Sequence, residues 1–462
     1  MNKMVFALLL FLSGVVCGQT TLTELVSLGL TETYQSKNIQ LRRQILDAEI
    51  ASFKASVGWQ LGLGGQVPAY AKSNLSTVQN DGNIAFQAVN YNNSSIGAKL
   101  SKTIWQTGGE IQIASGLQRF DNFSSQKHVY NGIPIRLSFR QKLAGYNPYK
   151  WEKENNLIKK EINQRQSKVD KMMIRRDITE AFFDVLLAQN EIQASENDVA
   201  LTQELMNIAQ VQDSLGVISK KQLLQLQLQL KLAQSKLNIA DSQLMSAKSR
   251  LSTLLGNRIN LEDKFAIPLP VSSHADVDAI VHFAKANRPE WLEYRRRIQA
   301  QSEQVKWTSR KYGPYIGLDA SVGVIRSDVA LSPIYTDAQQ DYGISLSFNI
   351  PIFDSHLKQN KVLTEKLKLE EQKNESQQAM MKLEDEIIRL AKEFDACQKR
   401  LDFAKEIQDI ATQNLKITTK TFKQGLINIA ELNLAIQAKN QALRNYLTET
   451  RRYWLFYYEL NL

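Results

Sequence analysis

The sequence predicts a mainly α-helical protein with a smaller antiparallel β part, built twice within one chain. The first observation is a stretch from His356 to Lys423 without proline or glycine, which would form one helix about 100 Å long. The second is a pair of polar, glycine-containing regions in which apolar and polar residues alternate, as in strands with one buried face. The third is that both kinds of segment recur in the same order in each half of the chain.

The long helix carries an apolar seam with the three-and-four spacing of coiled coils. Only Gln408 and Thr418 interrupt this seam. Its positions are Met380, Leu383, Ile387, Leu390, Phe394, Cys397, Leu401, Ala404, Gln408, Ala411, Leu415, Thr418 and Phe422. Helices of globular proteins average about a dozen residues. A helix of this length therefore indicates a protein that bridges a distance rather than a compact enzyme.

Residues 1–18 are predicted to be a secretory signal peptide and no part of the fold. Lys3 gives a positive start, an apolar run too short for a comfortable transmembrane helix follows, and small residues come after it. We expect cleavage between Gly18 and Gln19. Lipidation of Cys17 is the less favoured alternative, because Val16 stands where a lipoprotein signal has a small residue.

Cysteine content and charge argue against two classes of protein. Once the signal is removed, Cys397 is the one remaining cysteine, so an intramolecular disulfide cannot form, and its place on the apolar seam indicates a packed thiol. The net charge is +10, yet Lys and Arg are interspersed with Asp and Glu along the helices. Because no basic block is interleaved with aromatic residues, this charge indicates a solvated helix surface rather than a nucleic-acid site.

The order of elements divides the mature chain into two structural repeats. The first, residues 19–265, is predicted to hold helices at 21–57, 148–214 and 217–256 and strands within about 59–143. The second, residues 266–462, is predicted to hold helices at 276–310, 355–423 and 427–460 and strands within about 315–351. Turns at Gly216 and Gly425 join the last two helices of each repeat, and similar residues follow them, which indicates a gene duplication.

The predicted strands have one apolar and one polar face. In the second repeat, Tyr342, Ile344, Leu346 and Phe348 alternate with Gly343, Ser345, Ser347 and Asn349. Aromatic residues cluster near strand ends, at Trp59, Trp105, Tyr312, Tyr315 and Phe353. Such strands are typical of a membrane sheet with lipid on one side and water on the other, although a β-sandwich face would also show them. In the first repeat, Pro134 indicates an edge strand or a strand start, and the strand-like segment 95–119 has no assigned place.

The helix predicted at 217–256 has two apolar stripes. One consists of Leu and Ala at heptad positions from Leu223 to Leu254, and the other of Leu224, Leu228 and Leu232. A helix with two stripes contacts two neighbours, which suits a ring of helices better than a simple two-stranded coiled coil.

With these features the chain resembles the outer membrane efflux (TolC) protein family over nearly all of its mature length. The resemblance rests on the duplicated order, the glycine turns and three short motifs. These are Asn287-Arg288-Pro289-Glu290, Tyr312-Gly313-Pro314 and Phe348-Asn349-Ile350-Pro351-Ile352-Phe353-Asp354.

The resemblance implies a fold, a location and partners. The fold is a homotrimer in which four strands per subunit close one twelve-stranded β-barrel in the cell outer membrane, continued by an α-helical barrel through the periplasm. The implied function is the channel or exit duct of a tripartite efflux or type I secretion system. The implied partners are a periplasmic adaptor (membrane fusion) protein, an inner-membrane pump and outer-membrane lipid.

The resemblance also places a pore gate and adaptor-docking turns at the periplasmic tip. The docking turns are Leu215, Gly216 and Val217 in the first repeat and Gly425, Leu426 and Ile427 in the second. The gate positions are Glu431, Phe422, Gln222 and Leu434, of which only Glu431 keeps the acidic character of relatives. These residues imply a mainly apolar seal with one acidic ring. The alternative is that Glu431 is an ordinary solvated acid near a helix N-terminus.

We find no catalytic constellation, expect no cofactor and predict that the protein is not an enzyme. The nearest approach to a metal cluster, His274, Asp276, Asp278 and His282, is better explained as a helix start with acids in its first turn. The remaining alternative function is an exported coiled-coil scaffold or adaptor without channel activity. Neither function identifies the cargo.

Overall fold

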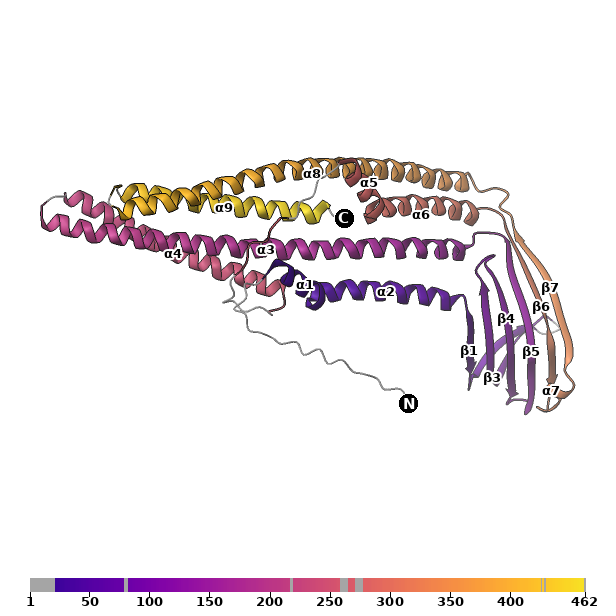
Figure 1. Cartoon of the computed structure of the whole chain (residues 1–462). Helices are drawn as coiled ribbons and strands as arrows, with labels where there is room; N and C mark the ends of the chain where they lie inside the picture. The colour runs from indigo at the N-terminus through magenta and orange to yellow at the C-terminus, as the bar shows by residue number, and fades with distance from the viewer. Residues whose placement is uncertain are drawn as a thin grey trace, which may run out of the picture. The chain divides into compact units, whose positions relative to one another are not determined.

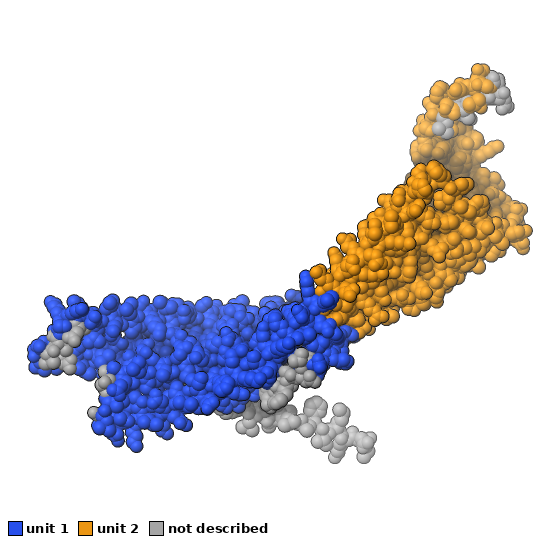
Figure 2. Space-filling view, turned by 90° about the horizontal axis from the view of Figure 1, so that it is seen from above, with its two compact units in different colours: residues 1–42, 164–288, 381–462 blue, residues 43–163, 289–380 orange. Residues whose placement is uncertain are grey.

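The structure, a computed structural model, describes residues 21–78, 82–216, 219–257, 265–270, 277–424, 426–427 and 429–460. The chain divides into two compact units (Figure 2). Unit 1 comprises residues 1–42, 164–288 and 381–462, and unit 2 comprises residues 43–163 and 289–380. Within the described residues, no helix combines the length and the apolar character needed to cross a membrane.

Helices and strands follow one another in the order that the sequence predicts (Figure 1). The helices are α1 Leu22–Glu32, α2 Tyr34–Ser56, α3 Pro148–Ser214, α4 Lys220–Leu254, α5 Val277–Asn287, α6 Pro289–Lys311, α7 Pro333–Thr336, α8 Leu357–Lys423 and α9 Ile429–Leu460. The strands are β1 Trp59–Gln66, β2 Tyr70–Val78, β3 Ile84–Ile104, β4 Gly109–Asn122, β5 Lys127–Ala144, β6 Tyr315–Asp328 and β7 Gln339–Asn349. Helices α3 and α8 each contain 67 residues and are each about 100 Å long.

Two of the predicted helices are each divided in two, for local reasons. At the first break, Thr33 has extended backbone, and its hydroxyl accepts a hydrogen bond from the Ser36 N–H at 3.2 Å, which caps α2. At the second, Pro289 opens α6, because proline lacks an N–H and is tolerated only at a helix start. The sequence periodicity predicts one continuous helix across each of these breaks. The division into two repeats itself stays a prediction.

In unit 1, parts of four helices lie side by side in the order α8, α9, α3, α4 (Figure 1). Arg400 of α8 binds Glu449 of α9 at 3.1 Å. Asp184 of α3 accepts from Arg451 of α9 and from Arg250 of α4, each at 2.8 Å. Two apolar clusters lie beneath these ion pairs, one joining α1, α3, α4 and α9 and the other joining α8 and α9.

The apolar seam predicted on α8 is confirmed. Every seam position from Met380 to Phe422 is buried or half-buried, and Ile387 and Cys397 are almost completely enclosed. From Leu390 to Ala404 the seam packs against α9, whose aromatic side chains Tyr446 and Tyr453 fill the other side of the contact. Removing this apolar area from water stabilises the pair by about 25 cal/mol per Å² buried.

The described residues of unit 2 form one antiparallel sheet of seven strands. Six of them follow one another in the order β1, β3, β4, β5, β6, β7, and β2 also pairs with β3. The unassigned segment 95–119 forms the later half of β3 and most of β4. The expectation for Pro134 was wrong: it lies in the central strand β5, where the register shifts between Gly132 and Ile135. A bulge accommodates proline because its missing N–H leaves no ladder bond unmade there.

Cys397 lies within the contact between α8 and α9, as expected of a packed thiol. Burial, reinforced by the Glu449 carboxylate, raises the pKa of the Cys397 thiol to about 11. The thiol is therefore protonated at pH 8, and the thiolate is the form that reacts with alkylating agents.

We predict that Cys397 does not react with N-ethylmaleimide at pH 8 in the folded protein and reacts fully after denaturation. Peptide mass spectrometry would count the adducts. A Leu215→Cys variant is the matched control, because that position is 71% exposed and should react within minutes. Rapid labelling of native Cys397 would contradict the burial described here.

Candidate functional site

One face of the sheet in unit 2 is apolar across all six strands of its main path. Directly paired residues form a continuous row of Leu61, Leu100, Ile113, Leu137, Val322 and Tyr342. At the two ends of the row, Leu61 is 77% and Tyr342 78% exposed. A contiguous apolar surface of this extent on a single chain needs cover from lipid or from another protein.

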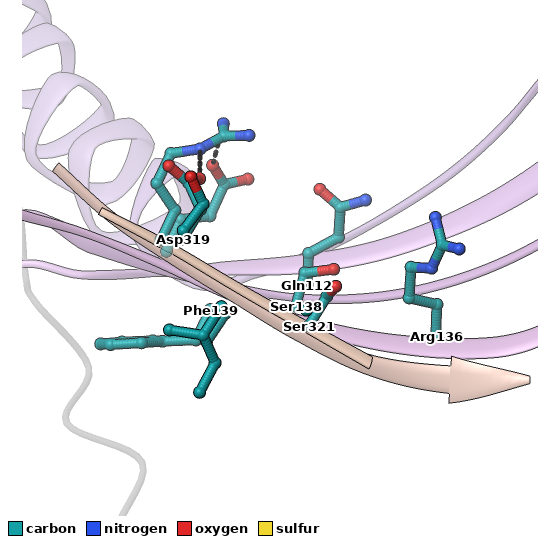
Figure 3. Close-up of a pocket in the computed structure, with 12 residues that line it drawn as sticks. Gln112, Arg136, Ser138, Phe139, Asp319 and Ser321 are labelled. Atoms are coloured by element: carbon teal, nitrogen blue, oxygen red, sulfur yellow. Dashed lines mark hydrogen bonds and ion pairs between the residues drawn. The ribbon is translucent and has the colours of Figure 1, made fainter. Parts of the chain in front are cut away.

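The opposite face of the sheet is polar. The neighbouring row consists of Gln60, Ser101, Gln112, Ser138, Ser321 and Gly343, and no member is apolar apart from the glycine. Figure 3 shows Gln112, Ser138 and Ser321 on one side of the strands and Phe139 on the other. Because side chains alternate along a strand, this separation follows directly from the alternating sequence. The sheet therefore presents two faces suited to two different surroundings.

The polar face is hollowed and lined by paired charges. A cavity of about 340 Å³ lies over β4, β5, β6 and β7. At its wall, Arg140 donates to Asp319 at 2.7 Å and lies 3.9 Å from Glu110. Ion pairs that remain partly exposed contribute about 0–1 kcal/mol each. Their clearer effect is to make this face compatible with water.

A second ion pair on the polar face crosses a whole strand. Arg136 of β5 binds Asp341 of β7, although β6 lies between them. Gly323 is the β6 residue directly between the two. A Cβ there would lie 2.6 Å from the Ile135 carbonyl oxygen and 3.0 Å from the Arg136 Cβ. A side chain at position 323 would therefore fill the space that the Arg136 side chain crosses to reach Asp341.

The two turns predicted as docking sites lie at the same end of unit 1 (Figure 1). In the first, Leu215 is exposed and Gly216 has a φ of +70°, which favours glycine. In the second, Leu426 is exposed, Ile427 is half-buried, and the Leu426 N–H donates to the Thr421 carbonyl at 3.2 Å. The other two predicted docking residues, Val217 and Gly425, lie outside the described residues.

The structure places the predicted gate residues beside these turns but does not test their role. Phe422 is half-buried in the last turn of α8, and Glu431 is exposed in the first turn of α9. Leu434 lies about one turn further along α9 and is 66% exposed. Gln222 lies in the first turn of α4, and its side chain is outside what the structure describes.

Clusters of metal-ligating residues do not occur in the part of the chain that the structure describes. Within the sequence cluster considered above, Asp278 and His282 lie in α5, whereas His274 and Asp276 fall outside the described residues.

Sequence reasoning missed an exposed apolar stripe on α8. Phe403, Ile407, Ile410 and Ile417 all lie on the helix surface and away from the buried seam. Their spacings of four, three and seven residues place them on one helix face, so the sequence could have indicated a second apolar stripe, as it did for α4. Arg136 and Asp341 were also not recognised as partners, because their pairing depends on strand order.

Comparisons with known proteins agree with this geometry. Residues 280–453 match the model of a protein family described as outer membrane efflux protein. A comparison with curated protein sequences gives no match.

Several solved structures share the fold. The Campylobacter jejuni CmeC outer membrane channel has a TM-score of 0.66 and 13% identity, over 95% of this chain and 84% of that chain. The outer membrane protein VceC of Vibrio cholerae has a TM-score of 0.62 and 13% identity, over 95% and 94%. The MtrE outer membrane channel of Neisseria gonorrhoeae, in its open state, has a TM-score of 0.61 and 12% identity, over 95% and 87%. The chain thus carries an outer membrane efflux protein domain and has the fold of outer membrane channels over nearly all of its length, which confirms the family resemblance expected from its sequence.

Proposed function

We propose that the protein is the outer-membrane exit duct of a tripartite efflux or type I secretion system. It would pass substrates from an inner-membrane pump across the periplasm and the outer membrane. The observation that carries this proposal is the two-faced sheet, which chain connections join to the long helices α3 and α8. The apolar face fits the lipid of the outer membrane, and the polar face fits a water-filled lumen.

A single chain leaves unpartnered apolar surface at both ends of its row of helices. Helix α4, at one end, exposes Leu224, Leu228 and Leu232, and α8, at the other end, exposes the stripe that includes Ile407 and Ile410. A helix edge on one copy can cover the opposite edge on the next, and repetition around an axis closes a ring. The family resemblance supports a ring of three copies, a homotrimer.

The glycine turns supply the docking surface for the periplasmic adaptor (membrane fusion) protein. Leu215 and Leu426 present exposed apolar side chains at the turns themselves. Exposed apolar residues beside glycine turns are suited to burial against a partner helix. Near these turns, Glu431 would form one acidic ring in the trimer, with Phe422 contributing to the seal.

The exit-duct function predicts that disrupting the helix ring abolishes transport. We expect Leu228→Asp to prevent trimer formation and to raise the accumulation of fluorescent efflux substrates to the level of a deletion strain, because it puts a charge into an apolar contact. Gln229→Asp is the control, since Gln229 is exposed and off both stripes. A deletion strain with unchanged dye accumulation and a purified protein without conductance in planar bilayers would favour the scaffold alternative.

The gate proposal predicts distinct effects of two substitutions in planar bilayers. Glu431→Ala should reduce cation selectivity and divalent-cation block, because it removes the acidic ring. Phe422→Ala should raise resting conductance, because it removes bulk from the seal. Glu406→Ala, an exposed acid elsewhere on the helices, is the control. Unchanged cation selectivity in Glu431→Ala would indicate that the Glu431 carboxylate is an ordinary solvated acid that interacts with the N-terminus of α9.

The two faces of the sheet predict opposite responses to the same charge. Ile344→Arg should destabilise the membrane-inserted protein by about 2–4 kcal/mol, because Ile344 is the central residue of β7 and the arginine would face lipid there. Ser345→Arg, one residue away on the polar face, should cost far less. Equilibrium unfolding from lipid vesicles measures both. Equal destabilisation by the two variants would show that the apolar face does not contact lipid.

A further inference from the structure

The main path of the sheet contains two strands more than the four that the resemblance implies. The strand that follows α2 is β1, and the strand that precedes α3 is β5, yet they are not neighbours. The hairpin of β3 and β4 lies between them, so six strands follow one another from β1 to β7. Strand β2 does not add a seventh strand to this order. It pairs with residues 84–92 of β3, whereas β1 pairs with residues 95–102 of the same strand.

We propose that all six strands are wall strands and that three copies close a barrel of eighteen strands. The inference rests on the trimeric exit duct proposed above and concerns the size of its outer-membrane lumen. Barrel diameter grows roughly linearly with strand number. An eighteen-stranded lumen is therefore about one and a half times as wide as a twelve-stranded one, with about twice the cross-section.

The pairing of β3 and β4 supports their place in the wall. Strand β4 is hydrogen-bonded on both sides, to β3 along Gly109–Asn122 and to β5 over nearly the same length. Moving the hairpin out of the wall would break the ladders that join it to β1 and to β5 and would expose their N–H and C=O groups. Such groups have no partner in lipid, so a β-structure in a membrane keeps its ladders.

The side chains of the hairpin follow the same two-faced pattern as the other strands. On the apolar face, Leu100 pairs with Ile113 and Ile96 pairs with Leu117. On the polar face, Ser101 pairs with Gln112, in the row that contains Ser138 and Ser321. A hairpin folded into the lumen as a plug would be surrounded by water on both faces. An apolar face that continues the apolar face of the neighbouring strands would then be exposed to water.

The two free edges of the sheet fit one another between copies. Strands β1 and β7 each have one unpaired edge among the described residues. Every neighbouring pair on the path is antiparallel, and with six strands the first and the last run in opposite directions. Strand β7 of one copy therefore meets β1 of the next in the antiparallel sense. Their lengths, 11 and 8 residues, allow pairing along most of both strands.

Fluorescence quenching at two adjacent positions of β4 tests whether the hairpin is part of the wall. Ile113→Cys and Gln112→Cys are labelled with bimane in the trimer and placed in vesicles that contain brominated phosphatidylcholine. We expect at least twofold stronger lipid quenching at position 113 and stronger quenching by aqueous iodide at position 112. Leu346→Cys and Ser345→Cys on β7 provide the reference contrast. Absence of lipid quenching at 113, with the β7 contrast intact, would overturn the inference.

Disulfide cross-linking tests the seam between copies. Gly62→Cys, where a side chain meets open space, is combined in turn with Gly343→Cys, Ser345→Cys and Ser347→Cys on the polar face of β7. We expect at least one combination to give a covalent ladder that stops at three copies. The double variant Ser101→Cys and Gln112→Cys should give only an intrachain bond, because these residues are paired within one chain.

The outcomes separate the two proposals. A three-copy ladder without lipid contact at 113 leaves the trimeric duct standing and overturns the eighteen-stranded barrel. A trimer by native mass spectrometry in which no seam pair cross-links overturns the closure of β7 on β1. A monomer that gives no ladder overturns the proposed function itself.

Discussion

The pairing requirement of backbone N–H and C=O groups is the constraint on which the rest of the structure depends. A sheet with an apolar face in lipid cannot leave an edge open, because each unpaired group there costs several kcal/mol. In the sheet of unit 2 each strand of the main path pairs with its neighbours, with local register shifts along β4 and β5, and the two outer edges are unpaired among the described residues. In the barrel proposed above, strand number, strand direction and the number of copies are therefore linked, and none can change alone.

The helices of unit 1 meet a related constraint by different means. Their backbone groups are satisfied within each helix, so only side chains decide how they associate. The seam of α8 is covered by α9 within the chain, whereas the stripes on α4 and α8 stay uncovered. Ion pairs such as Arg400 with Glu449 align the helices, and the apolar seams supply most of the stabilisation.

Much of the helical part could be predicted from the sequence, because periodicity is a local signal. The α8 seam and the turn at Gly216 lie where the pattern placed them. The break at Thr33 was missed, since it depends on how one hydroxyl caps the next helix. The place of segment 95–119 was missed for another reason: alternation identifies a strand but not its neighbours. The gate role proposed for Glu431 would depend on contacts between copies, which the periodicity of one chain does not reveal.

The Arg136–Asp341 ion pair constrains the alignment of strands as well as pairing two charges. Because it spans β5, β6 and β7 over the side-chain gap at Gly323, it holds three strands to one alignment. A slip of β7 by one residue would turn Asp341 to the apolar face, and a slip by two would move it about 7 Å away. The register of the edge strand β7 is thus constrained by a side-chain pair within one chain, in addition to the ladder between β6 and β7.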